Sequence, residues 1–271
     1  MSTTTSASSA GPARQIGFGP LLLTVFKAQL LSLAKSRKTL ILSIVALLPA
    51  AAALAYLLFD NTSGLSFYRG VLEHVVIAFL LPMIALFYGG PAVVEEIEGR
   101  TLIYLFLRPV AKPAIFLGKT AAAMVMTVAL TVIPVTILYG VALSAGDSPA
   151  DHLQLLAQGL VSLFVGGLSY TAVFAALGAV FARSLLAGIV FWGVAEWLGS
   201  FIPVVKFLTQ NFHVRNAGSL IDVGQLSQLE SFVLSKAIAI DISVSYAFLI
   251  AVIAVALAVG GWVFNTREYP M

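Results

Sequence analysis

One carboxylate, Glu196, lies inside a long apolar stretch of the sequence, with Trp192 and Trp197 near it. If that stretch crosses a membrane, burying an ionisable group there is costly, and such residues usually serve a function. Glu196 is therefore a candidate for lining a substrate path or a gate. The alternative is anchoring: near the outer end of the stretch, Glu196 would reach interfacial water or accept a hydrogen bond from a neighbouring helix. Tyr139 and Tyr170 would offer hydroxyl groups to a cavity between the helices, although lone aromatic residues more often serve packing.

A second group of carboxylates comprises Glu95, Glu96 and Glu98. A metal site there would need nitrogen or further oxygen ligands, but no histidine is close in sequence. The carboxylates would instead favour the positive N-terminal end of a short helix and present negative charge to a basic partner surface. The alternative is a solvated face without a partner. Glu73 and His74 form another polar pair, expected to mark the outer boundary of an apolar run; a titrating pair is the alternative.

The segment from Pro113 to Thr120 resembles part of a phosphate-binding loop, because Gly118-Lys119-Thr120 matches its end. Proline occupies the position of the first glycine, and it has no N–H for a phosphate. We therefore expect no nucleotide and no other cofactor to bind this chain, and no metal. Catalytic triads and HExxH motifs are also absent from the sequence, and so is cysteine.

The composition defines the class of protein that must position these residues. The chain is 60% hydrophobic and 10% charged, with a mean hydropathy of +1.01, whereas soluble domains carry about 25% charged residues. The apolar runs are continuous rather than alternating, which predicts helices instead of a β-barrel. The fold class is therefore an all-α polytopic membrane protein. The formal net charge of +3 gives no indication of nucleic-acid binding.

Six runs are long enough to cross about 30 Å of hydrocarbon. Residues 1–19 are expected to form a disordered tail, residues 20–38 an amphipathic interfacial helix, and residues 39–271 the transmembrane domain. The predicted spans are 40–59, 75–94, 120–145, 153–182, 184–205 and 242–266. Most of the fifteen Lys and Arg residues then fall on the side of the N-terminus. This bias predicts a multi-pass protein of the cell membrane with both termini cytoplasmic.

Two connecting segments are long enough to have their own structure. Residues 206–241 would lie outside, with a loop at 210–218 followed by a short helix on the membrane surface or dipping into it. Residues 95–119 would lie inside, with an acidic start, an apolar run and a stop at Arg108-Pro109. A simple connection would not need such an amphipathic helix. We therefore expect the inner segment to dock a soluble partner.

The inner segment also carries a family resemblance. The sequence Glu96-Ile-Glu-Gly99-Arg-Thr101-Leu-Ile-Tyr-Leu-Phe-Leu-Arg108-Pro109-Val110, followed by Gly118-Lys119, resembles the permease subunits of ABC type-2 exporters. Those proteins show E-x-x-x-G-T-L-x-x-L-L-x-x-P-[VI] between spans two and three. Arg100 interrupts the usual Gly-Thr pair here. The resemblance extends to the six-span topology, and the stand-alone permeases that include the nitrous-oxide-reductase maturation subunit are the most similar subgroup.

The resemblance implies a half-transporter that pairs with a second permease copy in the lipid bilayer. A separate ABC ATPase subunit would bind ATP and Mg²⁺ and seat the inner segment as a coupling helix. The residues expected to make that contact are Glu95, Glu96, Glu98, Gly99, Arg100, Thr101, Leu102, Leu105, Phe106, Arg108 and Pro109.

Three functions follow from this interpretation. The first is a transport permease without an ATPase site of its own. The second is a mechanotransmitter that drives an extracytoplasmic protein through residues 206–241. The third, with the weakest support, is an intramembrane lipid-modifying enzyme. The sequence does not indicate the substrate.

Overall fold

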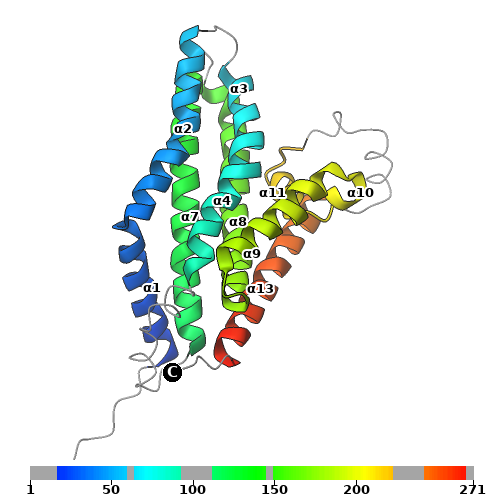
Figure 1. Cartoon of the computed structure of the whole chain (residues 1–271). Coiled ribbons are helices and arrows are strands. Elements are labelled where there is room, and N and C mark those ends of the chain that lie inside the picture. Colours follow the sequence, from blue (N-terminus) through cyan, green and yellow to red (C-terminus); the bar gives the residue numbers. More distant parts are fainter. Residues whose placement is uncertain (1–16, 60–63, 93–111, 145–148, 222–240, 267–271) are drawn as a thin grey trace, which may run out of the picture.

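The computed structural model describes residues 17–59, 64–92, 112–144, 149–221 and 241–266. All regular elements within these ranges are helices, as the continuous apolar runs predict. Two long helices form the centre: α7 (Lys112–Leu143) and α8 (Pro149–Val180) contact each other and most of the other helices. Figure 1 shows the remaining helices arranged around this pair, with α9 and α13 diverging from α2 and α3 toward one side.

The N-terminal part of this bundle is a pair of helices joined by a sharp turn. Helix α1 covers Phe18–Ala34, and α2 covers Arg37–Phe59. The predicted interfacial helix, 20–38, therefore ends earlier in the structure. The break occurs at Ser36 because its hydroxyl accepts a hydrogen bond from the Thr39 backbone N–H at 3.2 Å, which starts a new helix. Helix α1 runs beside the N-terminal part of α7, where Gly118 allows close approach to Leu22.

The second predicted span begins earlier than expected. Helix α3 (Gly64–Val71), the π-helical segment η1 (Leu72–Leu80) and α4 (Leu81–Gly89) follow one another without a break. Glu73 and His74 lie within this helical stretch rather than in front of it, which corrects the expected boundary at residue 75. A charged residue is tolerated here because Glu73 pairs with Arg215 of another helix.

Small residues allow the backbones of α4 and α8 to touch. A Cβ atom built on Gly178 would lie 2.3 Å from the carbonyl oxygen of Gly90, and one built on Gly89 would lie 2.8 Å from that of Thr171. Such contacts between small residues are the usual means by which membrane helices pack closely. They fix the C-terminal end of α4 against α8.

The fifth predicted span, 184–205, is interrupted near its end. Helix α9 (Ser184–Phe191) continues through the π-helical segment η2 (Trp192–Leu198) and the 3₁₀ turn η3 (Gly199–Phe201). Ile202 is extended, with φ −98° and ψ 114°, because Pro203 disfavours a helical conformation in the residue before it. The short helix α10 (Pro203–Lys206) follows. The last long helix, α13, covers Ile242–Thr266, as predicted.

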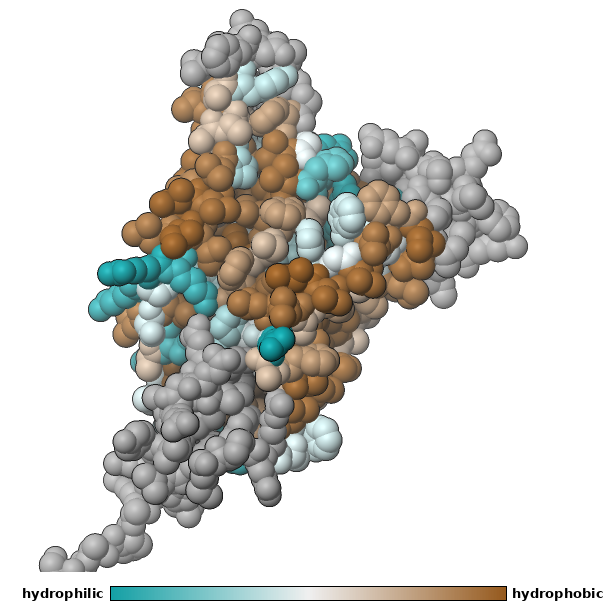
Figure 2. All heavy atoms as spheres, in the orientation of Figure 1, coloured by the Kyte–Doolittle hydropathy of each residue, from teal (hydrophilic) through white to brown (hydrophobic). Residues whose placement is uncertain are grey.

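Five helical stretches of the described residues are long and apolar enough to cross a membrane. They are Arg37–Tyr56, Phe67–Gly89, Lys112–Leu143, Leu153–Val180 and Ile242–Thr266. The stretch Ser184–Leu198 is also apolar but shorter. Figure 2 shows that hydrophobic residues cover most of the described surface on the visible face, interrupted by a few hydrophilic patches. This is the surface expected of a protein that faces lipid.

Candidate functional site: a polar helix held between the spans

Helix α11 (Gln210–Ala217) is rich in polar side chains and nevertheless lies inside the bundle. Gln210, His213 and Asn216 are all at most 5% exposed. The sequence predicts a loop at 210–218, and the structure corrects that prediction. The helix forms because Thr209 caps it: the Thr209 hydroxyl accepts a hydrogen bond from the Phe212 backbone N–H at 3.3 Å. Its polar side chains are stabilised by partners on several neighbouring elements.

Glu196 of η2 holds the N-terminal end of α11. One carboxylate oxygen accepts the Gln210 backbone N–H at 2.8 Å, and the other accepts the Asn211 backbone N–H at the same distance. The second oxygen also accepts the Tyr170 hydroxyl at 3.0 Å. The residue is 4% exposed. A carboxylate at this position satisfies free amides of the first helical turn and interacts favourably with the helix dipole. The geometry therefore favours the anchoring interpretation of Glu196.

The structure brings together two of the three residues predicted to line a path or gate. Tyr170 of α8 meets Glu196 directly. Tyr139 of α7 packs instead against Tyr68, with the two rings edge to face and their centroids 5.4 Å apart. Tyr139 and Tyr170 are both buried. The Tyr139 contact thus belongs to the α3–α7 interface and not to the Glu196 cluster.

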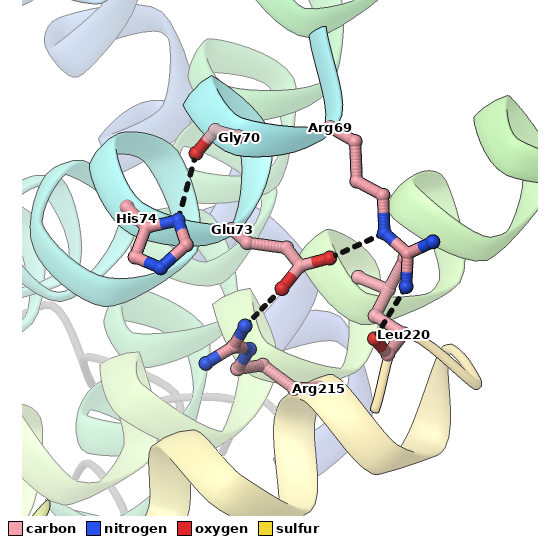
Figure 3. A network of polar contacts seen from close by, with 6 residues as sticks. All are labelled: Arg69, Gly70, Glu73, His74, Arg215 and Leu220. Atoms are coloured by element: carbon pink, nitrogen blue, oxygen red, sulfur yellow. Dashed lines mark hydrogen bonds and ion pairs between the residues drawn. The ribbon is translucent and has the colours of Figure 1, made fainter. Parts of the chain in front are cut away.

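An ion-pair network connects α11 to the second span (Figure 3). The Glu73 carboxylate accepts a hydrogen bond from Arg69 Nε at 2.8 Å and pairs with the Arg215 guanidinium of α11 through its other oxygen. Arg69 also donates to the Leu220 carbonyl oxygen at 3.2 Å. One carboxylate thus joins two arginines that lie far apart in sequence, which stabilises the polar residues of η1 within the helix.

His74 takes no part in this network. Its Nδ1 lies 3.1 Å from the Gly70 carbonyl oxygen of its own helix, and Figure 3 shows its ring on a different side of the helix from the Glu73 carboxylate. Glu73 and His74 therefore bond to different partners in the structure.

Two spans hold the other faces of α11. On α13, the Ser245 hydroxyl lies 3.0 Å from His213 Nδ1 and accepts the Asn216 side-chain amide at 2.8 Å. On α8, the Ser169 hydroxyl accepts the Gln210 side-chain amide at 2.6 Å. Burial lowers the pKa of His213 from its ordinary value, and its ring stacks on Phe248. Helix α11 is thus connected to four separate elements: η1, η2, α8 and α13.

Sequence reasoning identified Glu196 and Tyr170 but missed the polar side chains of α11. Gln210, His213, Arg215 and Asn216 stand in an eight-residue segment whose polarity is typical of a loop. One available signal was the buried carboxylate itself, since a carboxylate inside a span requires donors from elsewhere in the chain.

A second polar contact joins the start of α2 to the end of α4. The hydroxyl groups of Thr39 in α2 and Tyr88 in α4 are 2.7 Å apart, and Lys38 Nζ lies 5.5 Å from the centroid of the Tyr88 ring. This contact joins the α1–α2 turn to the end of α4. Tyr88 lies near the end of the described range 64–92. The predicted coupling residues, Glu95 to Pro109, lie outside the described residues.

The segment that resembles a phosphate-binding loop forms the first turns of α7. Residues Pro113 to Thr120 are helical, and Lys119 is buried. A phosphate-binding loop requires a turn whose backbone N–H groups wrap the phosphate, whereas a helix uses those groups internally. Within the described ranges, the structure also contains no group of three or more His, Cys, Asp or Glu residues that could hold a metal ion.

The helical fold, the apolar surface and the buried polar contacts define a multi-pass membrane protein. Residues 27–196 match the family model described as ABC-2 family transporter protein. This match covers more than half of the chain, and the chain belongs to that family. Membership implies a membrane-embedded permease of an ABC exporter, a class that works with an ABC ATPase and is generally not the ATPase itself. A search of curated proteins found no match. The family match ends at Glu196, so α11 and α13 lie beyond it.

Proposed function

We propose that this chain is one half of an exporter driven by ATP hydrolysis in a separate subunit. Two permease copies would form the translocation pathway in the cell membrane, each with six spans and both termini in the cytoplasm. The family match across residues 27–196 is the observation that carries this proposal. The sixth span would be the apolar stretch Ser184–Leu198 continued to Phe201, which adds to the five longer helices.

The coupling element of this proposal is the segment from Glu95 to Pro109. Its acidic residues would face a basic rim of the ATPase, while Leu102, Leu105 and Phe106 would enter an apolar groove. The described ends of the segment support such a role. Helix α4 leads into it from the tightly packed Gly89–Gly90 region, and α7 leads away from it as one long helix. A displacement of the segment would therefore reach two central helices directly.

The transport cycle follows from this arrangement. ATP binding closes the ATPase pair, and the coupling segments move with it. Helices α4 and α7 then shift relative to the other spans, and the membrane halves alternate between inward and outward access. The Thr39–Tyr88 contact would transmit the movement of α4 to the α1–α2 turn, because a hydrogen bond of 2.7 Å joins the two. ATP and Mg²⁺ act only in the partner subunit.

The test is to purify the chain with its ATPase and measure hydrolysis and transport. Phe106→Asp would place a charge in the proposed groove, and Leu105→Pro would break the helix. We expect both variants to insert normally but to lose the ATPase on purification. Ala111→Asp is a matched change just after the proposed contact, and this variant should retain the ATPase. Normal co-purification and hydrolysis by both variants would refute the docking role.

Helix α11 favours a second candidate function, a mechanotransmitter for a protein outside the membrane. It belongs to the segment 206–241 and is joined to η1, η2, α8 and α13 by hydrogen bonds and an ion pair. A displacement of these spans would therefore move α11 with them. Stimulation of ATP hydrolysis by a small molecule or lipid supports transport, whereas stimulation by a soluble outer protein supports mechanotransmission.

A further inference from the structure

The turn between α1 and α2 carries exposed basic side chains. We call residues 34–38 the elbow; Lys35 and Arg37 are exposed within it, and neither makes an ion pair with any described residue. No acidic residue occurs between Met1 and Phe59, so no carboxylate of α1 or α2 neutralises them. Figure 2 shows a hydrophilic patch at the left edge of the molecule, where Figure 1 places the elbow.

An apolar surface begins directly beside these charges. Leu40, Ile41 and Ile44 of α2 are between 57% and 62% exposed, and Leu48 continues the surface at 57%. Residues 41, 44 and 48 lie on one face of a helix because their spacing follows the helical period. A cationic site at the foot of an exposed apolar face matches an amphipathic anion, in which a charged head is attached to a hydrocarbon chain.

We propose that the elbow binds the headgroup of an anionic phospholipid of the inner leaflet. The phosphate contacts Lys35 and Arg37, and an acyl chain lies along the exposed face of α2. A basic residue near an anionic membrane surface adds about 1 kcal/mol to the attraction, which is about a fivefold change in binding constant. A free phosphate ion would use the charges but not the apolar face. The placement of the elbow at the inner leaflet rests on the topology of the proposed function.

The bound lipid would contact the part of the chain that is connected to α4. The residue after Arg37 is Lys38, whose ammonium group lies over the Tyr88 ring, and the next is Thr39, which contacts the Tyr88 hydroxyl. Headgroup occupancy would therefore hold the elbow in the position from which Thr39 reaches α4. This gives an anionic lipid a route to influence the helix that leads into residues 93–111.

The chain contains no cysteine, so a single introduced thiol can be labelled uniquely. Ala34→Cys places a fluorophore at the exposed start of the elbow. The full chain is reconstituted into phosphatidylcholine nanodiscs, and quenching by brominated phosphatidylglycerol is compared with quenching by brominated phosphatidylcholine. We expect phosphatidylglycerol to bind several-fold more tightly, with a preference that falls as salt is raised.

The matched variants separate a specific site from general attraction. Lys35→Gln and Arg37→Gln should each reduce the preference by about fivefold. Arg183→Gln, which removes an exposed arginine between α8 and α9, should leave it unchanged. Equal quenching by both lipids, or a preference that persists in the Lys35→Gln/Arg37→Gln double variant, would overturn the proposal. Competition by inorganic phosphate alone would also overturn it, by indicating a site for a free ion. The measurement needs no ATPase, so its result is independent of the docking test.

Discussion

The Tyr170 hydroxyl donates a hydrogen bond to the Glu196 carboxylate at 3.0 Å, and the same carboxylate accepts two backbone amides from the first turn of α11. Three donors from two different parts of the chain thus converge on one buried anion. Both oxygens of Glu196 accept hydrogen bonds. Because the donors come from α8 and α11, this one side chain of η2 joins the two helices.

Replacing Glu196 with glutamine should destabilise the protein by about 1–3 kcal/mol, because a side-chain N–H₂ would replace one of the accepting oxygens and face a buried donor. Tyr170→Phe removes only one of the three hydrogen bonds and should cost about 1 kcal/mol. Thermal unfolding in detergent measures both effects. Wild-type stability in both variants would contradict the anchoring role. Stability retained by Glu196→Gln together with lost transport would instead support the substrate-path interpretation.

Arg215 and Arg69 should differ in their effect on stability although both pair with Glu73. The Arg215 side chain is 25% exposed and its ion pair links separate segments. Arg69 is 45% exposed, its ion pair with Glu73 lies within one helical stretch, and its distant contact is a single hydrogen bond to the Leu220 carbonyl. We expect Arg215→Gln to cost about 1–3 kcal/mol and Arg69→Gln less than about 1 kcal/mol. A double-mutant cycle with Glu73→Gln isolates each pair. Equal effects of the two arginine variants would contradict this ranking.

The buried His213 predicts a loss of stability in mild acid. Burial lowers its pKa in the folded protein below the ordinary value of 6.5, so the unfolded chain binds the proton more readily. Its contribution is present above pH 6.5 and is lost as the pH falls below that value. The unfolding temperature should decrease in this range, and His213→Gln should remove that decrease.

Asp241 should affect stability only in more strongly acidic solution than His213 does. Hydrogen bonds with Ser243 lower the pKa of the Asp241 carboxyl from 3.8, so its contribution is present above that pH and is lost at lower values. Asp241→Asn should therefore leave the loss near pH 6 unchanged. A decrease near pH 6 that persists in His213→Gln would show that another group is responsible.

The apolar helices were predictable from sequence, whereas their polar connections were not. Helix α13 has the predicted bounds because its apolar run is uninterrupted by charge from Ile242 to Thr266. The helix of the second span continues through Glu73 because this carboxylate pairs with Arg215, a partner more than a hundred residues away. Likewise, α11 is a helix because distant residues stabilise its polar groups. Periodicity within a segment contains no information about such partners.

The Thr39–Tyr88 contact predicts a specific effect where α2 meets the end of α4. Tyr88→Phe removes only the hydroxyl that meets Thr39, whereas Thr39→Val also removes hydrogen bonds to Leu33 and Ser36; each should destabilise the protein by about 1 kcal/mol or more. Thr136→Val is the matched control, because the exposed Thr136 hydroxyl bonds only to the Val132 carbonyl of its own helix. Thermal unfolding compares the three variants. Equal effects of Tyr88→Phe and Thr136→Val would mean that the bond between α2 and α4 adds no stability.

The close approach of α4 and α8 predicts that Gly178 tolerates no side chain. In Gly178→Ala, the new methyl group would meet the Gly90 carbonyl oxygen at 2.3 Å, so the helices must separate, at a cost of about 1–3 kcal/mol or more. Gly140→Ala is the control, since nothing lies within 4 Å of its Cβ position. That change should be neutral or stabilising by up to about 1 kcal/mol. An unfolding temperature unchanged in Gly178→Ala would contradict the packing described for these helices.

The contacts of α11 also constrain the order in which the protein can be completed during synthesis. Gln210 to Ala217 leave the ribosome before Ser245 and Tyr246, yet His213, Asn216 and the Ala217 carbonyl depend on those residues for hydrogen bonds. Until the last span is inserted, these polar groups would lack their hydrogen bonds to Ser245 and Tyr246, which makes their burial costly. Helix α11 can therefore take its final place only after α13 has been inserted, so the later helix completes the packing around the earlier one.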